Sequence, residues 1–280
     1  MKPAVPPQRP GFPARLPNAS NPQNGSKSIA INAIKTPATA AILKNKALIK
    51  PAAAPLSFDS RAVRDRMVQK LAAQGLADAR VLAAMGLVER HRFVDSALST
   101  QAYEDTSLPI GLGQTISKPN VVARMLELLM QGALFAKNAQ GMATDKLGRV
   151  LEIGTGCGYQ AALLSHLATE VYSIERLRGL HDKSRDNLRG MRVANLHLLF
   201  GDGMLGYAKG APYAGIIAAA GGEALPTAWI DQLAVGGRLV APVQGANGAQ
   251  ALVVVDKTAQ GVRQTMLEPV HFVPLKSGTS

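Results

Sequence analysis

The alternation of short apolar runs with longer helical patterns is the feature that most constrains this chain. Apolar runs begin near residues 149, 171, 196 and 213, and helical periodicity over 158–168 and 176–190 separates the first three. Strands that alternate with helices in this way pair in parallel, with the helices packed on the faces of the sheet. We therefore predict an α/β fold with a doubly wound, mostly parallel sheet.

The last part of the chain departs from this alternation. A helix is predicted over 226–237, followed by strands over 238–243, 251–256 and near 269–275. These strands follow one another without a helix, and short connections join antiparallel strands. The sequence thus predicts an antiparallel edge strand on an otherwise parallel sheet.

Two helices are predicted before any strand. Residues 61–75 hold apolar side chains at helical spacing, and a second helix over 78–90 has Asp78 as its N-cap. We predict a single domain over 58–280. Within it, residues 58–119 form a helical N-terminal addition and substrate segment, and residues 120–280 form a Rossmann-like core.

Residues 1–57 differ from the rest in composition. They are rich in proline, contain eight Lys or Arg residues and have no acidic residue, so the rest of the chain carries only +4 of the net charge of +12. Such a stretch cannot bury enough apolar surface to offset its ordering entropy, and we predict a disordered tail. A polybasic arm for RNA or an anionic surface is the functional alternative. The mild charge of the remainder makes nucleic acid an unlikely partner.

Cysteine, histidine and apolar residues restrict the other classes. Cys157 is the only cysteine, which excludes an internal disulfide framework and a cysteine-based metal cluster, and the five histidines lack metal-ligand spacing. No apolar run approaches the ~20 residues of a membrane span, and no secretory apolar segment is present. We predict a cytoplasmic protein without a metal or a membrane partner.

A glycine-rich turn between a strand and a helix is the strongest local signal. Gly154, Gly156 and Gly158 allow backbone to approach a ligand closely. A dinucleotide fingerprint requires its third glycine at position 159, where Tyr159 stands. S-adenosylmethionine has no pyrophosphate, and it needs an acid for its ammonium group, which Glu152 can supply. The turn therefore favours S-adenosylmethionine over a nicotinamide cofactor.

Acidic residues also end the next two predicted strands. Glu175 lies 21 residues after Gly154, where a carboxylate can accept hydrogen bonds from both ribose hydroxyls. Asp202, followed by Gly203, can accept from the adenine amino group. Alone, Glu175 could be a charge at a helix N-terminus and Asp202 a turn residue. Their occurrence at successive strand ends predicts a cofactor site.

An upstream segment connects these features to a known family. Residues 108–119 read LPIGLGQTISKP, and supporting segments are RHRFVD (90–95), LEIGTGCGYQ (151–160), GDG (201–203), GGRLVAPV (236–243) and HFVPL (271–275). In these segments the chain resembles the protein-L-isoaspartate (D-aspartate) O-methyltransferases over residues 58–276. Segment 108–119 is the most specific part, since general methyltransferases lack it.

The resemblance implies a Rossmann-like class I methyltransferase that repairs damaged protein. Such an enzyme transfers a methyl group from S-adenosylmethionine to the free α-carboxylate of L-isoaspartyl residues in proteins and peptides. The resemblance marks Ser117 as the active-site serine and Gln250 as a cofactor contact. The expected cofactor-binding residues are Thr115, Ser117, Glu152, Gly154, Thr155, Gly156, Gly158, Glu175, Arg176, Asp202, Gly203 and Gln250.

The chemistry requires little from the protein except positioning. A carboxylate with a pKa near ~3.5 is already ionised at neutral pH, so no general base is needed. Thr115 and Ser117 offer hydroxyl donors just before a helix that begins near Pro119, where free backbone amides favour an anion. We expect Thr115, Ile116 and Ser117 to position the substrate, with Ser117 as a non-covalent catalytic residue. Helix capping is the structural explanation of this serine.

Two departures from the family pattern leave alternatives open. Ala214 stands where the family usually has aspartate, and Gly221–Gly222 stand where proline is common. One alternative is a methyltransferase that acts on RNA or a small molecule through the basic tail. The other is a protein that binds the cofactor but has lost turnover.

Overall fold

The computed structural model describes residues 60–132, 135–137, 141–245 and 248–280, and these belong to one compact unit. The predicted tail over 1–57 lies outside the described residues. None of the helices in the described ranges is long and apolar enough to cross a membrane.

A twisted sheet forms the centre of the domain, with strand order β10-β9-β8-β7-β4-β5-β6. Strands β4, β5, β6, β7 and β8 pair in parallel, and β8, β9 and β10 pair antiparallel, as the sequence predicts. The short β3 pairs antiparallel with β4. The bounds are β3 Phe135–Lys137, β4 Ala143–Ile153, β5 Ala168–Glu175, β6 Leu196–Phe200, β7 Tyr213–Ala218, β8 Leu233–Gln244, β9 Gln250–Thr258 and β10 Gly261–Val270.

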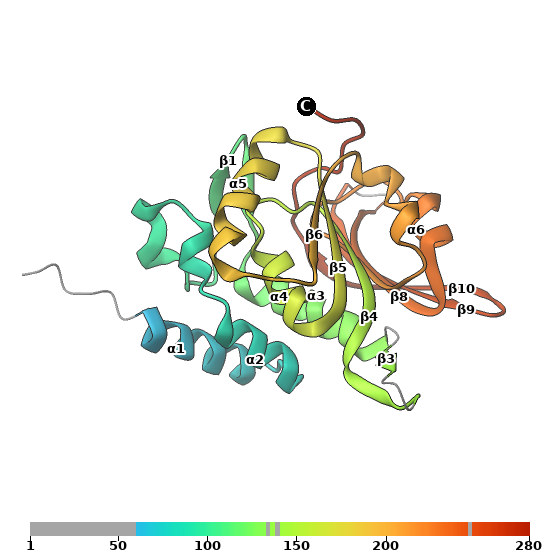
Figure 1. The fold of residues 1–280 in the computed structure, drawn as a ribbon, viewed down its shortest axis with the longest axis horizontal. Helices are drawn as coiled ribbons and strands as arrows, with labels where there is room; N and C mark the ends of the chain where they lie inside the picture. Colours follow the sequence, from blue (N-terminus) through green and yellow to red (C-terminus); the bar gives the residue numbers. More distant parts are fainter. Residues whose placement is uncertain (1–59, 133–134, 138–140, 246–247) are drawn as a thin grey trace, which may run out of the picture. The chain divides into compact units, whose positions relative to one another are not determined.

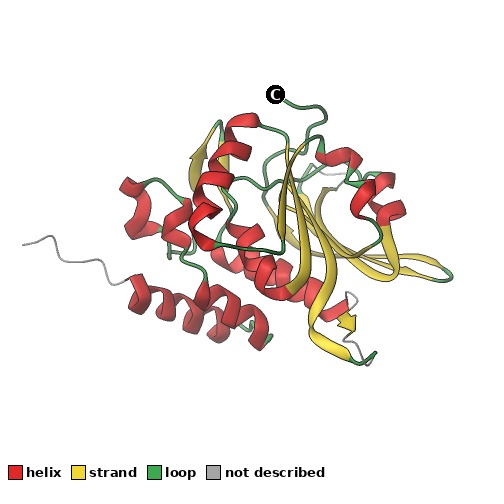
Figure 2. Cartoon of the chain, viewed as in Figure 1, coloured by secondary structure: helices red, strands yellow, loops and turns green. Residues whose placement is uncertain are grey.

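Helices cover both faces of this sheet (Figure 2). Helices α3 (Pro119–Gly132), α4 (Tyr159–Leu167) and α5 (Arg178–Leu188) pack with α1 and α2 in one apolar cluster, and α6 (Thr227–Gln232) packs in a second. Neighbouring residues of one strand enter different clusters, since Val150 lies in the first and Leu151 in the second. This alternation follows from the period of two along a strand. The doubly wound fold is confirmed.

The N-terminal addition begins with two helices, α1 (Ser60–Ala73) and α2 (Ala79–Leu87) (Figure 1). Asp78 caps α2 as predicted, since its carboxylate accepts hydrogen bonds from the amides of Arg80 and Val81 at 2.9 and 3.3 Å. Two short 3-10 helices, η1 (Arg90–Phe93) and η2 (Ser96–Gln101), follow. The addition then ends in a two-stranded sheet of β1 (Leu108–Gly111) and β2 (Gln114–Ile116), which is separate from the main sheet.

Two boundaries predicted at the end of the chain were wrong. The last strand is β10, at Gly261–Val270. The strand expected near 269–275 does not form: beyond the end of β10, Pro274 makes an isolated bridge with Gly221. β10 is an edge strand whose side chains are mostly exposed, so it lacks the apolar alternation of a buried strand. The predicted helix over 226–237 ends at Gln232, and β8 begins at Leu233.

Candidate active site

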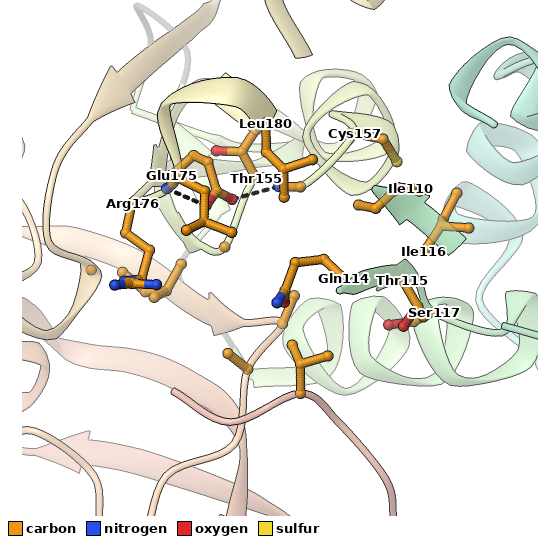
Figure 3. A pocket seen from close by; sticks show the side chains of 18 of the residues that line it. Ile110, Gln114, Thr115, Ile116, Ser117, Thr155, Cys157, Glu175, Arg176 and Leu180 are labelled. Atoms are coloured by element: carbon orange, nitrogen blue, oxygen red, sulfur yellow. Dashed lines mark hydrogen bonds between the residues drawn. The ribbon is translucent and has the colours of Figure 1, made fainter. Parts of the chain in front are cut away.

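The main cavity lies at the carboxyl ends of β4 and β5 and has a volume of about 510 Å³. This is the edge where an open parallel sheet binds ligands, close to the point at which the strand order reverses. The segments that line the cavity include the β1–β2 hairpin with Ser117, the glycine turn after β4, residues 174–177 at the end of β5, and residues 273–276 near the C-terminus. Figure 3 shows Glu175 and Arg176 at one end and Thr115, Ile116 and Ser117 at the other.

The glycine turn adopts a conformation that side chains disfavour. Gly154, Gly156 and Gly158 have φ angles of 89°, 56° and 92°, in the left-handed region. Gly154 and Gly156 line the cavity together with Thr155. Gly158 lies behind it, where an added Cβ would come within 2.8 Å of Leu188. The turn thus presents backbone, with little side chain, to a ligand.

A buried polar chain supports the floor of the cavity. The hydroxyl groups of Thr155 and Ser173 lie 2.6 Å apart, and Ser173 donates in turn to Oε2 of Glu152. Glu152 is fully buried, and burial raises its pKa to about 8 although the Ser173 hydroxyl acts in the opposite direction. In the described part of the chain, Oε1 of Glu152 and Nε2 of Gln160 lack hydrogen-bond partners. Gln160 lines the cavity, whereas Glu152 lies behind it.

Glu175 organises the other end of the turn. Its two carboxylate oxygens accept hydrogen bonds from the amides of Gly156 and Leu177, both at 2.9 Å. This carboxylate lines the cavity beside Arg176, whose Nε donates to the carbonyl of Gly278 at 2.9 Å. The acid therefore fixes the turn and also borders the cavity.

Four predicted cofactor residues do not line the cavity: Glu152, Gly158, Asp202 and Gln250. Asp202 accepts from the amides of Met204 and Gly278 at 2.8 and 2.6 Å, so it joins the end of β6 to the C-terminal segment. Gln250 binds the backbone of Phe272 in both directions, at 2.6 and 3.2 Å. Gly203 does line the cavity, but Asp202 and Gln250 do not. Both side chains support segments that form the wall.

The predicted acceptor strip forms the opposite side of the cavity. Thr115, Ile116 and Ser117 all line it, and Ile116 is buried while Thr115 is exposed. Helix α3 begins at Pro119, two residues after Ser117, as predicted. The structure thus brings residues 115–117 and the glycine turn, some 40 residues apart in the chain, to one cavity.

Sequence reasoning missed the residue that anchors this strip. Arg90 is fully buried and donates to the carbonyl groups of Ala102 and Ser117, both at 2.7 Å. Its guanidinium also lies 4.8 Å from the ring centre of Tyr159, and burial lowers its pKa. The segment RHRFVD contains Arg90, but no periodicity or spacing indicates that its side chain is turned inward.

Among the described residues there is no group of three or more His, Cys, Asp and Glu side chains that could hold a metal ion. Cys157 lines the cavity but is buried, and burial raises the pKa of its thiol to about 11. The thiol is therefore protonated at neutral pH, which does not favour a nucleophilic role.

Comparison with known proteins finds relatives over the whole described domain. The family model for Protein-L-isoaspartate(D-aspartate) O-methyltransferase (PCMT) matches residues 62–280. A protein-L-isoaspartate O-methyltransferase from Methylibium petroleiphilum is 60% identical over 228 residues, which is 81% of each chain. One from Leptothrix cholodnii is 60% identical over 80% of this chain and 76% of its own. One from Ralstonia nicotianae is 54% identical over 77% and 69%.

Solved structures share the fold. One described as a protein-L-isoaspartate O-methyltransferase superimposes with a TM-score of 0.66 at 24% identity and covers 76% of this chain and 66% of its own. A second, from Plasmodium falciparum and in complex with S-adenosyl-L-homocysteine, has a TM-score of 0.62 at 22% identity and covers 76% and 98%. These likenesses confirm the Rossmann-like architecture.

Proposed function

The chain belongs to the protein-L-isoaspartate(D-aspartate) O-methyltransferase family, and from this membership we propose how its residues divide the work of methyl transfer. The enzyme transfers a methyl group from S-adenosylmethionine to the free α-carboxylate of L-isoaspartyl residues in damaged proteins. The products are S-adenosylhomocysteine and a protein L-isoaspartate methyl ester. When bound, S-adenosylmethionine supplies a methyl group on a sulfonium sulfur, and S-adenosylhomocysteine is a good leaving group.

The cofactor would lie along the turn after β4. The backbone of residues 154–156 approaches it closely, and Glu175 accepts from the ribose hydroxyls while Arg176 borders the same end. Glu152 lies buried beneath the turn with an unpaired Oε1, which suits the ammonium of the methionine part. Gly203 lines the adenine side, and we assign Asp202, Gln250 and Gly158 supporting roles behind the wall.

The acceptor carboxylate would lie against the strip over 115–117. Thr115 and Ser117 donate hydroxyl hydrogen bonds to it or to the methyl donor, and Ile116 supplies an apolar wall that excludes water. Because the carboxylate is ionised at neutral pH, these residues need not remove a proton. Alignment of the two reactants and exclusion of water from them are the remaining contributions to catalysis, and we assign both to the walls of the cavity.

One observation carries this assignment: the hairpin strip and the glycine turn line a single cavity of about 510 Å³. A donor bound on the turn and an anion bound on the strip would therefore be adjacent. A protein that only binds the cofactor has no need of hydroxyl groups on the opposite wall.

Replacement of Ser117 by alanine tests the assignment. With an isoaspartyl peptide as substrate, we expect Ser117→Ala to lower kcat/KM by about 10- to 100-fold, since a hydrogen bond to a charged group is worth roughly 1.5–3 kcal/mol. The affinity for S-adenosylhomocysteine, measured by calorimetry, should change much less. Base-labile methyl esters are the readout, and the normal aspartyl peptide should give none.

The exposed Ser96, on η2, provides the matched control. Ser96→Ala should match the wild-type enzyme. Equal turnover by Ser117→Ala and the wild type would remove Ser117 from the site.

Partners and location follow from the same proposal. The substrates are isoaspartyl-containing proteins and peptides, and we propose that nucleic acid is not a partner, since residues 59–280 carry only +4 of the net charge. The basic residues of 1–57 lie outside the described part, and a role for them as an RNA arm stays open to test with labelled RNA. A cytoplasmic location remains a prediction from the sequence.

A further inference from the structure

The β1–β2 hairpin buries Leu108, Ile110 and Ile116 in the core, but its strands do not pair with the main sheet. Its two strands form a sheet of their own, apart from the main sheet. At its tip, Gly111, Leu112 and Gly113 have φ angles of 100°, 52° and 69°, all in the left-handed region, where leucine is strained. Side-chain contacts must therefore set the position of the hairpin relative to the glycine turn, since no strand pairing does so.

Three contacts hold the hairpin against the cofactor side of the core. Nζ of Lys183, on α5, donates to the carbonyl of Ile110 at 2.7 Å. Cδ1 of Ile110 lies 3.2 Å from where a Cβ on Gly156 would be, and Cδ1 of Leu112 lies 3.1 Å from the same position on Gly179. The glycines at 156 and 179 thus permit a close approach, and Lys183 provides the polar bond. Figure 1 shows β1 beside α5.

The two ends of the hairpin segment are held in different ways. At the Ser117 end, Arg90 is fully buried and binds two carbonyl groups. At the Ile110 end, Lys183 is only half-buried, so water competes for its ammonium. The buried end is the fixed one, and the bond from Lys183 is the contact that opens more easily.

We infer that Lys183 is a positioning residue for methyl transfer, which holds the β1–β2 hairpin down on the glycine turn so that the acceptor strip faces the donor methyl group. With the bond formed, Ile110 covers Gly156 and Leu112 covers the start of α5, which closes the cofactor side of the cavity. With the bond broken, the strip is still attached at Ser117, but its distance from the cofactor turn is no longer fixed.

The test compares three full-length variants. Lys183→Met keeps an unbranched side chain that is one atom shorter and removes the donor, and Lys183→Arg keeps a charged donor. Arg185→Met removes a positive charge from an exposed position on the same helix and is the matched control. Turnover is measured with an isoaspartyl peptide, and amide hydrogen exchange over 108–116 is measured with and without S-adenosylhomocysteine.

We expect Lys183→Met to lower kcat about tenfold, the loss typical of one hydrogen bond from a charged donor, with a smaller change in the KM of the peptide. Exchange over 108–116 should become faster, and the protection that S-adenosylhomocysteine gives to this segment should decrease. Lys183→Arg should keep most of the wild-type kcat and most of the protection of residues 108–116 from exchange. Arg185→Met should match the wild type.

Two results would overturn the inference. One is unchanged kcat and unchanged exchange over 108–116 in Lys183→Met. The other is a loss of kcat in Arg185→Met equal to that in Lys183→Met, which would assign the effect to the positive charge of α5. Only the kinetic part of the inference rests on the proposed function. If the wild-type protein did not methylate the peptide, the proposed function would be refuted. Faster exchange over 108–116 in Lys183→Met would still show that Lys183 holds the hairpin in place.

Discussion

The two walls of the cavity are built by different means. The cofactor wall consists of strand ends, in which β4 leads into the glycine turn and β5 leads into Glu175. The acceptor wall consists of a hairpin outside the sheet, which is held by Arg90 at one end and Lys183 at the other. In the first wall the topology places the ligand contacts, and in the second single long-range side chains do so.

This difference explains where a substitution should act. On the cofactor wall the strands are fixed by parallel pairing on both sides of β4, so removal of a side chain should affect binding and leave the strand ends in place, although loss of Glu175 also frees two amides that it holds. On the acceptor wall removal of an anchor should move the wall itself. Cofactor affinity and peptide turnover are therefore expected to separate.

Removal of the Glu175 carboxylate should have the largest effect, and it tests most directly whether the two walls act independently. Glu175→Ala removes both acceptors for the amides of Gly156 and Leu177 and the proposed ribose contact. Each hydrogen bond to a charged group contributes roughly 1.5–3 kcal/mol, so we expect the Kd for S-adenosylhomocysteine to rise by about 100-fold or more. Calorimetry measures this directly.

The exposed carboxylate of Glu104 supplies the control for charge, and Glu104→Gln should bind the cofactor product as the wild type does. If Glu175→Ala instead kept its affinity and lost only peptide turnover, the division of the cavity into two walls would be wrong.

The same difference sets what the sequence can predict. The glycine turn and Glu175 follow apolar strands directly, so their meeting at one sheet edge could be predicted from the alternation of elements. The acceptor strip could be placed near the cofactor only through the family resemblance. Arg90 and Lys183 carry no local signal, because an inward-facing cation in a polar segment looks like a surface residue until the chain is folded.

The C-terminal boundaries failed for a related reason. The segment over 271–275 has the apolar content of a strand, but it lines the wall of the cavity, and its backbone bonds to Gly221 and Gln250 instead of a ladder. The edge strand β10 is mostly exposed and does not alternate between apolar and polar residues, yet it pairs with β9 with one register shift. A short apolar segment has the same sequence pattern whether it is buried in a cavity wall or paired in a sheet.

The fixed end of the acceptor wall should show the next largest effect. Arg90→Lys keeps the charge, but a single ammonium cannot reproduce a planar guanidinium that bridges two carbonyl groups. We expect the kcat with an isoaspartyl peptide to fall about tenfold and the free energy of unfolding to fall by about 2–3 kcal/mol, with a smaller change in cofactor affinity. Steady-state kinetics and urea unfolding measure these quantities.

Arg92, on the same 3-10 helix, is exposed and pairs with Glu89 at 3.6 Å, so Arg92→Lys is the control and should lower neither quantity appreciably. Loss of cofactor affinity as large as the loss of kcat in Arg90→Lys would show that the two walls are not independent.

The effect expected from Glu152, beneath the cofactor wall, appears only as a dependence on pH. Burial raises the pKa of this carboxyl from its ordinary 4.5 to about 8, so the folded chain keeps a proton that the unfolded chain has lost between these values. Stability from this group is complete below the lower value and decreases as the pH rises to about 8, by at most ~1.4 kcal/mol per pH unit.

Urea unfolding at pH 6, 7 and 8 should therefore show a decrease in the wild type that Glu152→Gln lacks, while the exposed Glu104→Gln keeps the wild-type slope. A cationic ligand above Oε1 favours the ionised form, so S-adenosylhomocysteine should bind the wild type more tightly as the pH rises towards 8, relative to Glu152→Gln. If the two proteins showed parallel dependences in both measurements, the carboxylate would already be ionised in the free enzyme. An ionised Glu152 would need a partner that stabilises its charge. The cofactor wall would then depend on side chains from distant parts of the chain, as the acceptor wall does.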